Sequence, residues 1–148
     1  MRYLADFEPG QLFTAGPVEV TQEEVIAFAS RYDPQPFHTD PVAAEDSFFK
    51  GLASSGWMTA ALTMRLFAES GLAVAGGLIG RDVELHWPRP TYPGDMLRAE
   101  TEVLEVIPSR SRPDRGMIRV RTTTLNQRDE VAQTMLCRML VPARPSQG

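Results

Sequence analysis

The chain has 148 residues, of which 43% are hydrophobic and 23% are charged. This length and balance predict one globular domain, residues 1–148, whose core is large enough to fold without a disulfide or a structural metal. The formal net charge of -4 disfavours electrostatic binding to nucleic acid or to an anionic membrane surface.

Targeting and metal-binding signals are weak in this sequence. The single cysteine, Cys137, allows no internal disulfide and fits a reducing compartment. The first ten residues lack a basic start followed by an apolar stretch, and no apolar run approaches the length of a membrane span. The histidines, the cysteine and the carboxylates show no ligand spacing typical of zinc or calcium sites. We therefore expect a cytoplasmic protein with no bound metal or cofactor.

The first third of the chain predicts one strand and two helices. A short strand is expected near residues 12–20. Thr21 and Glu24 have the residue types of a capping box, which predicts the start of a helix there. Asp40 has the residue type of a second N-cap, and the proline that follows it is tolerated in a first helical turn.

The segment from Ser55 to Ser70 predicts a helix of a different kind. Apolar residues cover most of its circumference, and its only charged residues, Arg65 and Glu69, come near its C-terminal end. A helix that is apolar nearly all round is typical of a buried helix. Gly71 has the residue type that commonly ends a helix.

The second half of the chain predicts an antiparallel sheet. Period-two alternation of apolar and polar residues is the signature of half-buried strands. Four such strands can curl around the central helix and bury one of its faces, which predicts an α+β fold. The edges of one curled sheet stay exposed, so we also expect a homodimer, and we expect residues 144–148 to be frayed. The alternating runs are residues 81–87, 97–104, 118–124 and 131–139.

The candidate catalytic residues are Asp33 and His38, which flank a turn that contains Pro34 and Pro36. Proline fixes its own φ and restricts the residue before it, so a tight turn could aim both side chains at one small volume. A carboxylate and an imidazole that share one water molecule can carry out acid–base chemistry. The alternative is an ordinary loop in which Asp33 only terminates the preceding helix.

Three segments resemble the MaoC-like dehydratase family, which includes (R)-specific enoyl-CoA hydratases and has the hotdog fold. The segment from Asp33 to His38 resembles the hydratase motif D-x-N-P-x-H, with Gln35 in place of its asparagine. Residues 51–58 resemble the small-residue stretch that opens the central helix. Residues 89–95 resemble a Pro-x-x-Pro-Gly-Asp link between the first two strands of the sheet.

This resemblance implies reversible addition of water to a trans-2-enoyl-CoA, with Asp33 and His38 sharing the catalytic water and with their acid and base roles unassigned. It also implies a dimer with active sites near its interface. Charge that develops on the thioester oxygen needs backbone N–H donors, which a helix N-terminus supplies. Gly56 or its neighbour Trp57 is the expected donor, and Ser55 belongs to the same substrate-binding segment.

Further substrate contacts are less strongly indicated. Arg110 and Arg112, in an expected hairpin, are candidates for contacting the phosphates of coenzyme A, because arginine offers forked donors. The alternative is a solvated hairpin whose charges only aid solubility. Gln35 is a candidate for holding substrate or for bracing the turn. His86 is expected to be a structural residue that faces away from the helix.

Two other functions stay open from the sequence. One is a hotdog acyl-CoA thioesterase, in which water would attack the thioester carbon and release a free thiol. The other is an acyl-CoA-binding module without catalysis, a hypothesis that rests on the departure at Gln35.

Overall fold

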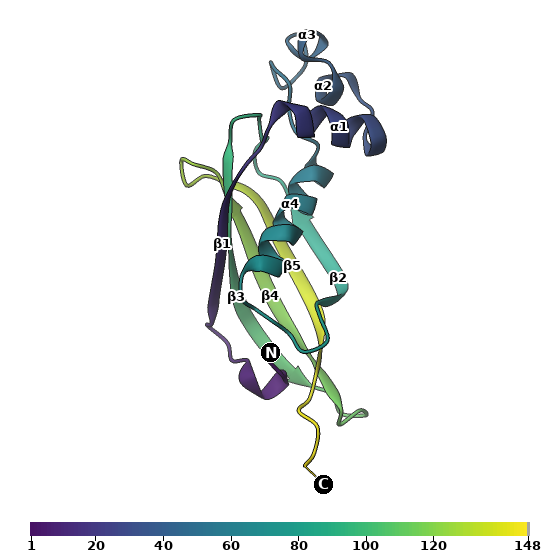
Figure 1. Cartoon of the computed structure of the whole chain (residues 1–148), viewed down its shortest axis with the longest axis vertical. Helices are drawn as coiled ribbons and strands as arrows, with labels where there is room; N and C mark the ends of the chain where they lie inside the picture. The colour runs from purple at the N-terminus through teal and green to yellow at the C-terminus, as the bar shows by residue number, and fades with distance from the viewer. Residues whose placement is uncertain (148) are drawn as a thin grey trace.

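The computed structural model describes residues 1–147. Five strands form one antiparallel sheet in the order β1-β3-β4-β5-β2, and the sheet curves around the central helix α4 (Figure 1). Helices α1, α2 and α3 gather at one end of the sheet. This arrangement confirms the expected α+β hotdog fold. The elements in chain order are η1 Leu4–Asp6, β1 Leu12–Glu19, α1 Gln22–Tyr32, α2 Pro36–Thr39, α3 Pro41–Ala44, α4 Gly56–Glu69, β2 Ile79–His86, β3 Met96–Pro108, β4 Arg115–Leu125 and β5 Val131–Pro142.

The expected helix caps are present. Thr21 Oγ1 accepts a hydrogen bond from the backbone N–H of Glu24, at 3.2 Å, and so caps α1. Asp40 Oδ1 accepts from the backbone N–H groups of Val42 and Ala43 and caps α3. The turn between these helices contains one feature that the sequence did not predict, the single helical turn α2.

The central strands alternate as expected, but the edge strand does not. Buried and less buried side chains alternate along the first eight residues of β3 and along most of β4 and β5. The expectation of a half-buried strand is wrong for β2, where Val83 is 52% exposed. The physical reason is its position: β2 has one neighbour, β5, and little of the chain covers its faces.

Helix α4 is buried on one face only. Its buried side chains include Thr59 and Thr63, whereas Trp57 is 60% exposed and Met64 is 44% exposed. Within a single chain the sheet therefore covers one face of the helix, as expected, although apolar residues continue around its other side. The opposite side carries exposed apolar residues that no other element covers among residues 1–147.

A polar belt divides the core into two hydrophobic clusters. One cluster lies near the N-terminus of α4 and includes Met58 and Leu97, and the other lies toward its C-terminal end and includes Phe67 and Val120. Between them lie buried polar side chains joined by hydrogen bonds. We call these side chains the polar belt; they are Thr63, Thr101, Thr122, Thr124 and Gln133.

The end of the chain is partly anchored. Arg144 donates a hydrogen bond to Asp6, at 2.8 Å, and its guanidinium lies over the ring of Tyr3. The fraying of residues 144–148 stays a prediction, and Gly148 lies outside the described residues. Within residues 1–147, no helix is long and apolar enough to cross a membrane.

Replacing Leu66 with alanine tests whether the seam between α4 and the sheet stabilises the fold. Leu66 is 1% exposed, so the substitution leaves a cavity and should lower the free energy of unfolding by about 2–5 kcal/mol. Arg65→Ala on the exposed face of the same helix is the matched control and should cost less than about 1 kcal/mol. Urea unfolding measures both, and equal losses would contradict this packing.

Candidate active site

The turn that follows α1 places Asp33 and His38 close together. The backbone N–H of Asp33 bonds to Ala29 at the end of α1, and the N–H of Gln35 then bonds back to the carbonyl of Asp33 at 2.7 Å. Pro36 occupies the first position of α2, where a missing N–H costs nothing. His38 follows on this single turn of helix. The chain therefore reverses tightly enough to bring the imidazole back beside the carboxylate.

The two side chains can share one water molecule. His38 Nε2 lies 3.5 Å from Asp33 Oδ2. This separation is too long for a strong direct hydrogen bond, but it is short enough for one water to contact both atoms. The His38 side chain is 8% exposed and that of Asp33 is 18% exposed, so both groups are sheltered but accessible from the pocket.

A backbone carbonyl fixes the orientation of the imidazole. His38 Nδ1 lies 2.6 Å from the carbonyl oxygen of Ala53. A carbonyl only accepts hydrogen bonds, so Nδ1 carries a proton. In the neutral ring, Nε2 then has its lone pair free on the side of Asp33, where it can accept a proton from water.

The carboxylate of Asp33 is held in its ionised form. Partial burial raises the pKa of Asp33, but hydrogen bonds from Ser55 and Gln35, together with the nearby His38 ring, outweigh that effect. The net pKa lies below its ordinary value. Ser55 Oγ donates to Oδ2 at 2.6 Å, and Gln35 Nε2 donates to Oδ1 at 2.5 Å. Asp33 is therefore ionised at neutral pH, and its lowered pKa makes it a weak base that is suited to accept a hydrogen bond from water.

The start of α4 offers one free backbone donor. Ser55 is fully buried and caps the helix, and its Oγ accepts the backbone N–H of Trp57 at 3.2 Å. This contact occupies the Trp57 donor. The N–H of Gly56 has no acceptor among residues 1–147 and Gly56 lines the pocket, so Gly56 is the better placed of the two expected donors.

A pocket of about 410 Å³ opens beside these groups. Its walls include four aromatic side chains, those of Phe48, Phe49, Trp57 and Trp87. Trp87 was expected to belong to a strand face, but it lies just beyond β2 and forms part of the pocket wall. The residues around the pocket that bear on its chemistry are Asp33, His38, Phe48, Phe49, Ser54, Gly56, Trp57, Thr59, Trp87, Arg89 and Thr91.

Close packing of Trp87 explains the glycine at position 56. A Cβ atom at Gly56 would lie 2.8 Å from Cε2 of the Trp87 indole, so any larger residue would displace the ring. A glycine at this position could in principle leave room for substrate. The structure shows that much of this room is taken by Trp87, whose ring also meets Trp57 edge-on at 5.6 Å between centroids.

Some predicted contacts do not reach the pocket. Gln35 and Ser55 contact Asp33 and do not line it. Strand β3 begins near the site and runs 13 residues to the hairpin that carries Arg110 and Arg112, roughly 40 Å along the strand. The hairpin lies at the opposite end of the sheet from α1–α3 (Figure 1). These two arginines therefore cannot contact substrate at the Asp33 site of the same chain.

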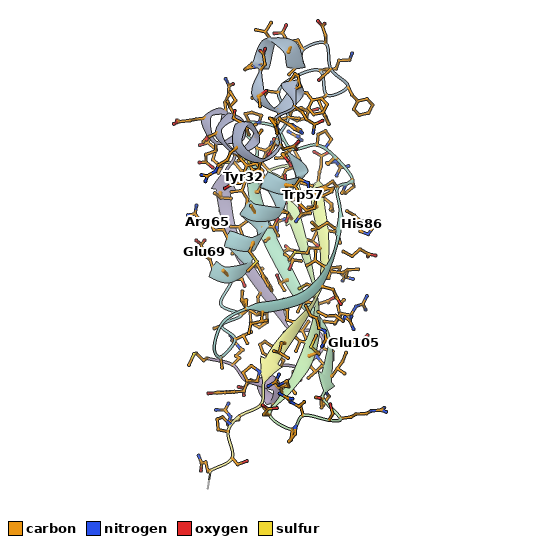
Figure 2. All side chains as sticks on the ribbon, turned by 90° about the vertical axis from the view of Figure 1, so that its right-hand side faces the viewer. Tyr32, Trp57, Arg65, Glu69, His86 and Glu105 are labelled. Carbon is orange, nitrogen blue, oxygen red and sulfur yellow. The ribbon has the colours of Figure 1, made fainter. Side chains whose placement is uncertain are left out.

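The remaining reactive side chains lie outside the site. His86 is exposed, and its Nε2 lies 3.2 Å from Glu84. Figure 2 shows His86 at the outer edge of the molecule, as the sequence predicted. Burial raises the pKa of the Cys137 thiol, and the charge of Asp82 raises it further, which disfavours a nucleophilic thiolate. Among residues 1–147, no group of three or more His, Cys, Asp or Glu is placed to share a metal ion.

Removing the Ser55 hydroxyl should raise the pKa of Asp33. The Ser55→Ala variant loses a hydrogen bond that favours the carboxylate over the carboxylic acid. A depressed pKa stabilises the fold above the unfolded-state pKa, and this stabilisation is lost as pH falls through the folded-state pKa. In the variant, this stabilisation should therefore be smaller, and its loss should be complete at a higher pH. Titration of the side-chain carboxyl by carbon NMR measures the pKa directly.

Asp82 is the internal control for this titration. Its pKa is lowered by a hydrogen bond from Arg138 on β5, with no contact to Ser55. The pKa of Asp82 should be the same in the wild-type protein and in the Ser55→Ala variant. An unchanged pKa for Asp33 in the Ser55→Ala variant would show that this hydroxyl does not hold the carboxylate.

Comparison with known proteins places this geometry in a family. The family described as MaoC like domain matches residues 6–126. A MaoC-like dehydratase from Rhodospirillum rubrum is 49% identical, with a TM-score of 0.94, and the match covers 99% of this chain and 100% of that one. The (R)-hydratase from A. caviae involved in PHA biosynthesis is 26% identical, with a TM-score of 0.76 and coverage of 92% and 98%. The uncharacterized protein YdeM of Bacillus subtilis (strain 168) is 31% identical over 127 residues, 85% of this chain and 89% of YdeM. The chain belongs to the MaoC-like domain family.

Proposed function

We propose that this protein catalyses the reversible addition of water to a trans-2-enoyl-CoA, giving a 3-hydroxyacyl-CoA. The observation that carries the proposal is the 3.5 Å separation of His38 Nε2 and Asp33 Oδ2 at the wall of an aromatic pocket. The similarity to an (R)-hydratase and to a MaoC-like dehydratase supports the same reaction class.

The two side chains supply the proton transfers that hydration needs. Water is a poor nucleophile, so it must lose a proton as its oxygen bonds to the β-carbon. His38 Nε2 and Asp33 Oδ2 both have lone pairs that can accept it. The α-carbon gains one proton from the pair as the carbon–carbon double bond is lost. One water molecule is added, and the enzyme ends with the protons it began with.

Gly56 is the proposed donor to the thioester oxygen. Negative charge builds on that oxygen while water attacks the β-carbon, and a fixed N–H group at a helix N-terminus stabilises it. Gly56 is the first residue of α4 and lines the pocket. Thioester binding there would place the β-carbon toward the Asp33–His38 pair.

We also propose that the active protein is a homodimer. Ile79 and Val83 on the edge strand β2 are each more than half exposed, and so is Trp57 on the uncovered face of α4. An exposed strand edge with apolar side chains favours pairing with a second copy, and a twofold arrangement is the common solution.

Replacing either member of the pair should slow hydration strongly. Asp33→Asn removes the ionised carboxylate and His38→Ala removes the imidazole, and each should lower kcat/KM for crotonyl-CoA by roughly 10²-fold or more. Loss of enoyl absorbance measures the rate. Asp129→Asn is the matched control for Asp33→Asn, because the Asp129 side chain is 79% exposed and lies outside the pocket, and this variant should hydrate crotonyl-CoA at close to the wild-type rate.

The same assay separates the alternative functions. A thioesterase would release free thiol, which a thiol reagent detects, whereas a hydratase consumes the enoyl group without thiol release. A non-catalytic module would bind acyl-CoA without turnover of any chain length. Rates near wild type in Asp33→Asn or His38→Ala would remove that residue from the mechanism.

Charge on the edge strand should separate the proposed dimer. The Val83→Arg substitution places a cation on β2 and should shift the protein from dimer to monomer in light scattering at micromolar concentration. Ile107→Arg introduces the same charge at an exposed apolar position on β3 and should leave the dimer intact. A wild-type monomer under these conditions would overturn the assignment.

A further inference from the structure

The wall behind the pocket is polar. Thr59, which is 2% exposed, lines the pocket together with Trp87. Thr63 lies one turn further along α4, on the same face of the helix, and is completely buried. Gln133 of β5 is also completely buried. The space that an apolar tunnel for a long acyl chain would need is therefore occupied by polar side chains.

A continuous chain of hydrogen bonds joins these side chains to the pocket wall. The indole Nε1–H of Trp87 donates to Gln133 Oε1 at 2.9 Å. Gln133 Nε2 donates to Thr63 Oγ1 at 3.0 Å, and Thr63 Oγ1 lies 2.6 Å from Thr124 Oγ1. The chain links the end of β2 to β5, α4 and β4, so it crosses the whole interior between the helix and the sheet.

Two further contacts hold the indole of Trp87, although the residue is 41% exposed. One of its faces packs so closely against Gly56 that a Cβ atom there would overlap the ring, and Trp57 contacts it edge-on. Rotation of the indole out of the pocket would break its hydrogen bond to Gln133. A long acyl chain that forced this rotation would leave the buried Oε1 of Gln133 unpaired, and it should therefore bind roughly 5- to 150-fold more weakly.

We propose that the chain from Trp87 through Gln133 to Thr63 and Thr124 closes the acyl pocket and limits the substrate to short acyl chains. This inference rests on the proposed hydration of an enoyl-CoA. Gln133 is the residue that sets the limit, because its amide holds the indole in place. It is a specificity-determining residue that acts through Trp87.

Making position 133 apolar should admit longer chains. Gln133→Leu has nearly the same volume, but it releases the Trp87 N–H and leaves an apolar surface in the seam. Each substrate methylene that becomes buried should gain about fourfold in kcat/KM. The ratio of kcat/KM for decenoyl-CoA to that for crotonyl-CoA should therefore rise by at least about tenfold relative to wild type. The wild-type protein should prefer crotonyl-CoA.

Two further variants test whether the effect is specific. Thr122→Val breaks another buried hydrogen bond of the polar belt, the 2.8 Å contact with Thr101, which does not touch the pocket. It should lower stability without changing the chain-length ratio. Trp87→Phe removes the indole donor but keeps a ring, and should move the ratio in the same direction as Gln133→Leu. If Gln133→Leu does not fold, Trp87→Phe provides the test of the chain-length ratio.

Binding of saturated acyl-CoA separates this inference from the proposed reaction. Calorimetric affinity should rise little from butyryl-CoA to decanoyl-CoA in wild type and should rise steeply in Gln133→Leu. If no enoyl-CoA is hydrated but this pattern holds, the proposed reaction fails and the limit on chain length stands. Equal hydration of both chain lengths by wild type, a steep rise in wild-type affinity, or an unchanged ratio in both folded pocket variants would overturn the inference.

Discussion

The site depends on a single hydroxyl that joins two distant parts of the chain. Ser55 Oγ accepts the backbone N–H of Trp57 and so begins α4, and the same atom donates its proton to Asp33. The N-terminus of the central helix and the carboxylate therefore have a fixed relative position. His38 is tied to the same segment through the carbonyl of Ala53. Residues 53–56 therefore contact both members of the proposed catalytic pair, and they hold these groups in place together with the turn that carries Gln35.

The polar belt fixes the position of α4 relative to the sheet. Threonine and glutamine side chains in the middle of a core would be costly if they were unpaired, yet no described side-chain nitrogen or oxygen that is fully buried lacks a partner. Because each hydrogen bond fixes a donor against a specific acceptor, the belt sets the registration of α4 on the sheet more strictly than apolar packing alone. The two hydrophobic clusters on either side of the belt contain most of the buried apolar side chains. The belt determines where the pocket ends.

The sequence alone was sufficient to predict the features that depend on interactions between residues close together in the chain. The caps at Thr21 and Asp40, the alternation of β3 to β5 and the proximity of Asp33 to His38 all follow from residues within a few positions of one another. The role of Trp87 could not be predicted, because it depends on Gly56 and Gln133, which are 31 and 46 positions away in the chain. The exposure of β2 was missed for a related reason. Alternation predicts a strand but not whether the strand lies at an edge, which only the topology decides.

Gln35 shows how a departure from the family pattern can keep the geometry of a site. Glutamine has one more methylene than asparagine, so its amide reaches further from the backbone. In this turn the side chain folds back over two residues, and its Nε2 donates to Asp33 Oδ1, while Ser55 holds the other oxygen. Both oxygens of the carboxylate are then fixed, and Oδ2 still faces His38. A binding module would need neither an ionised carboxylate nor an imidazole of defined tautomer beside it. Residues that maintain both argue that this turn is built to move protons.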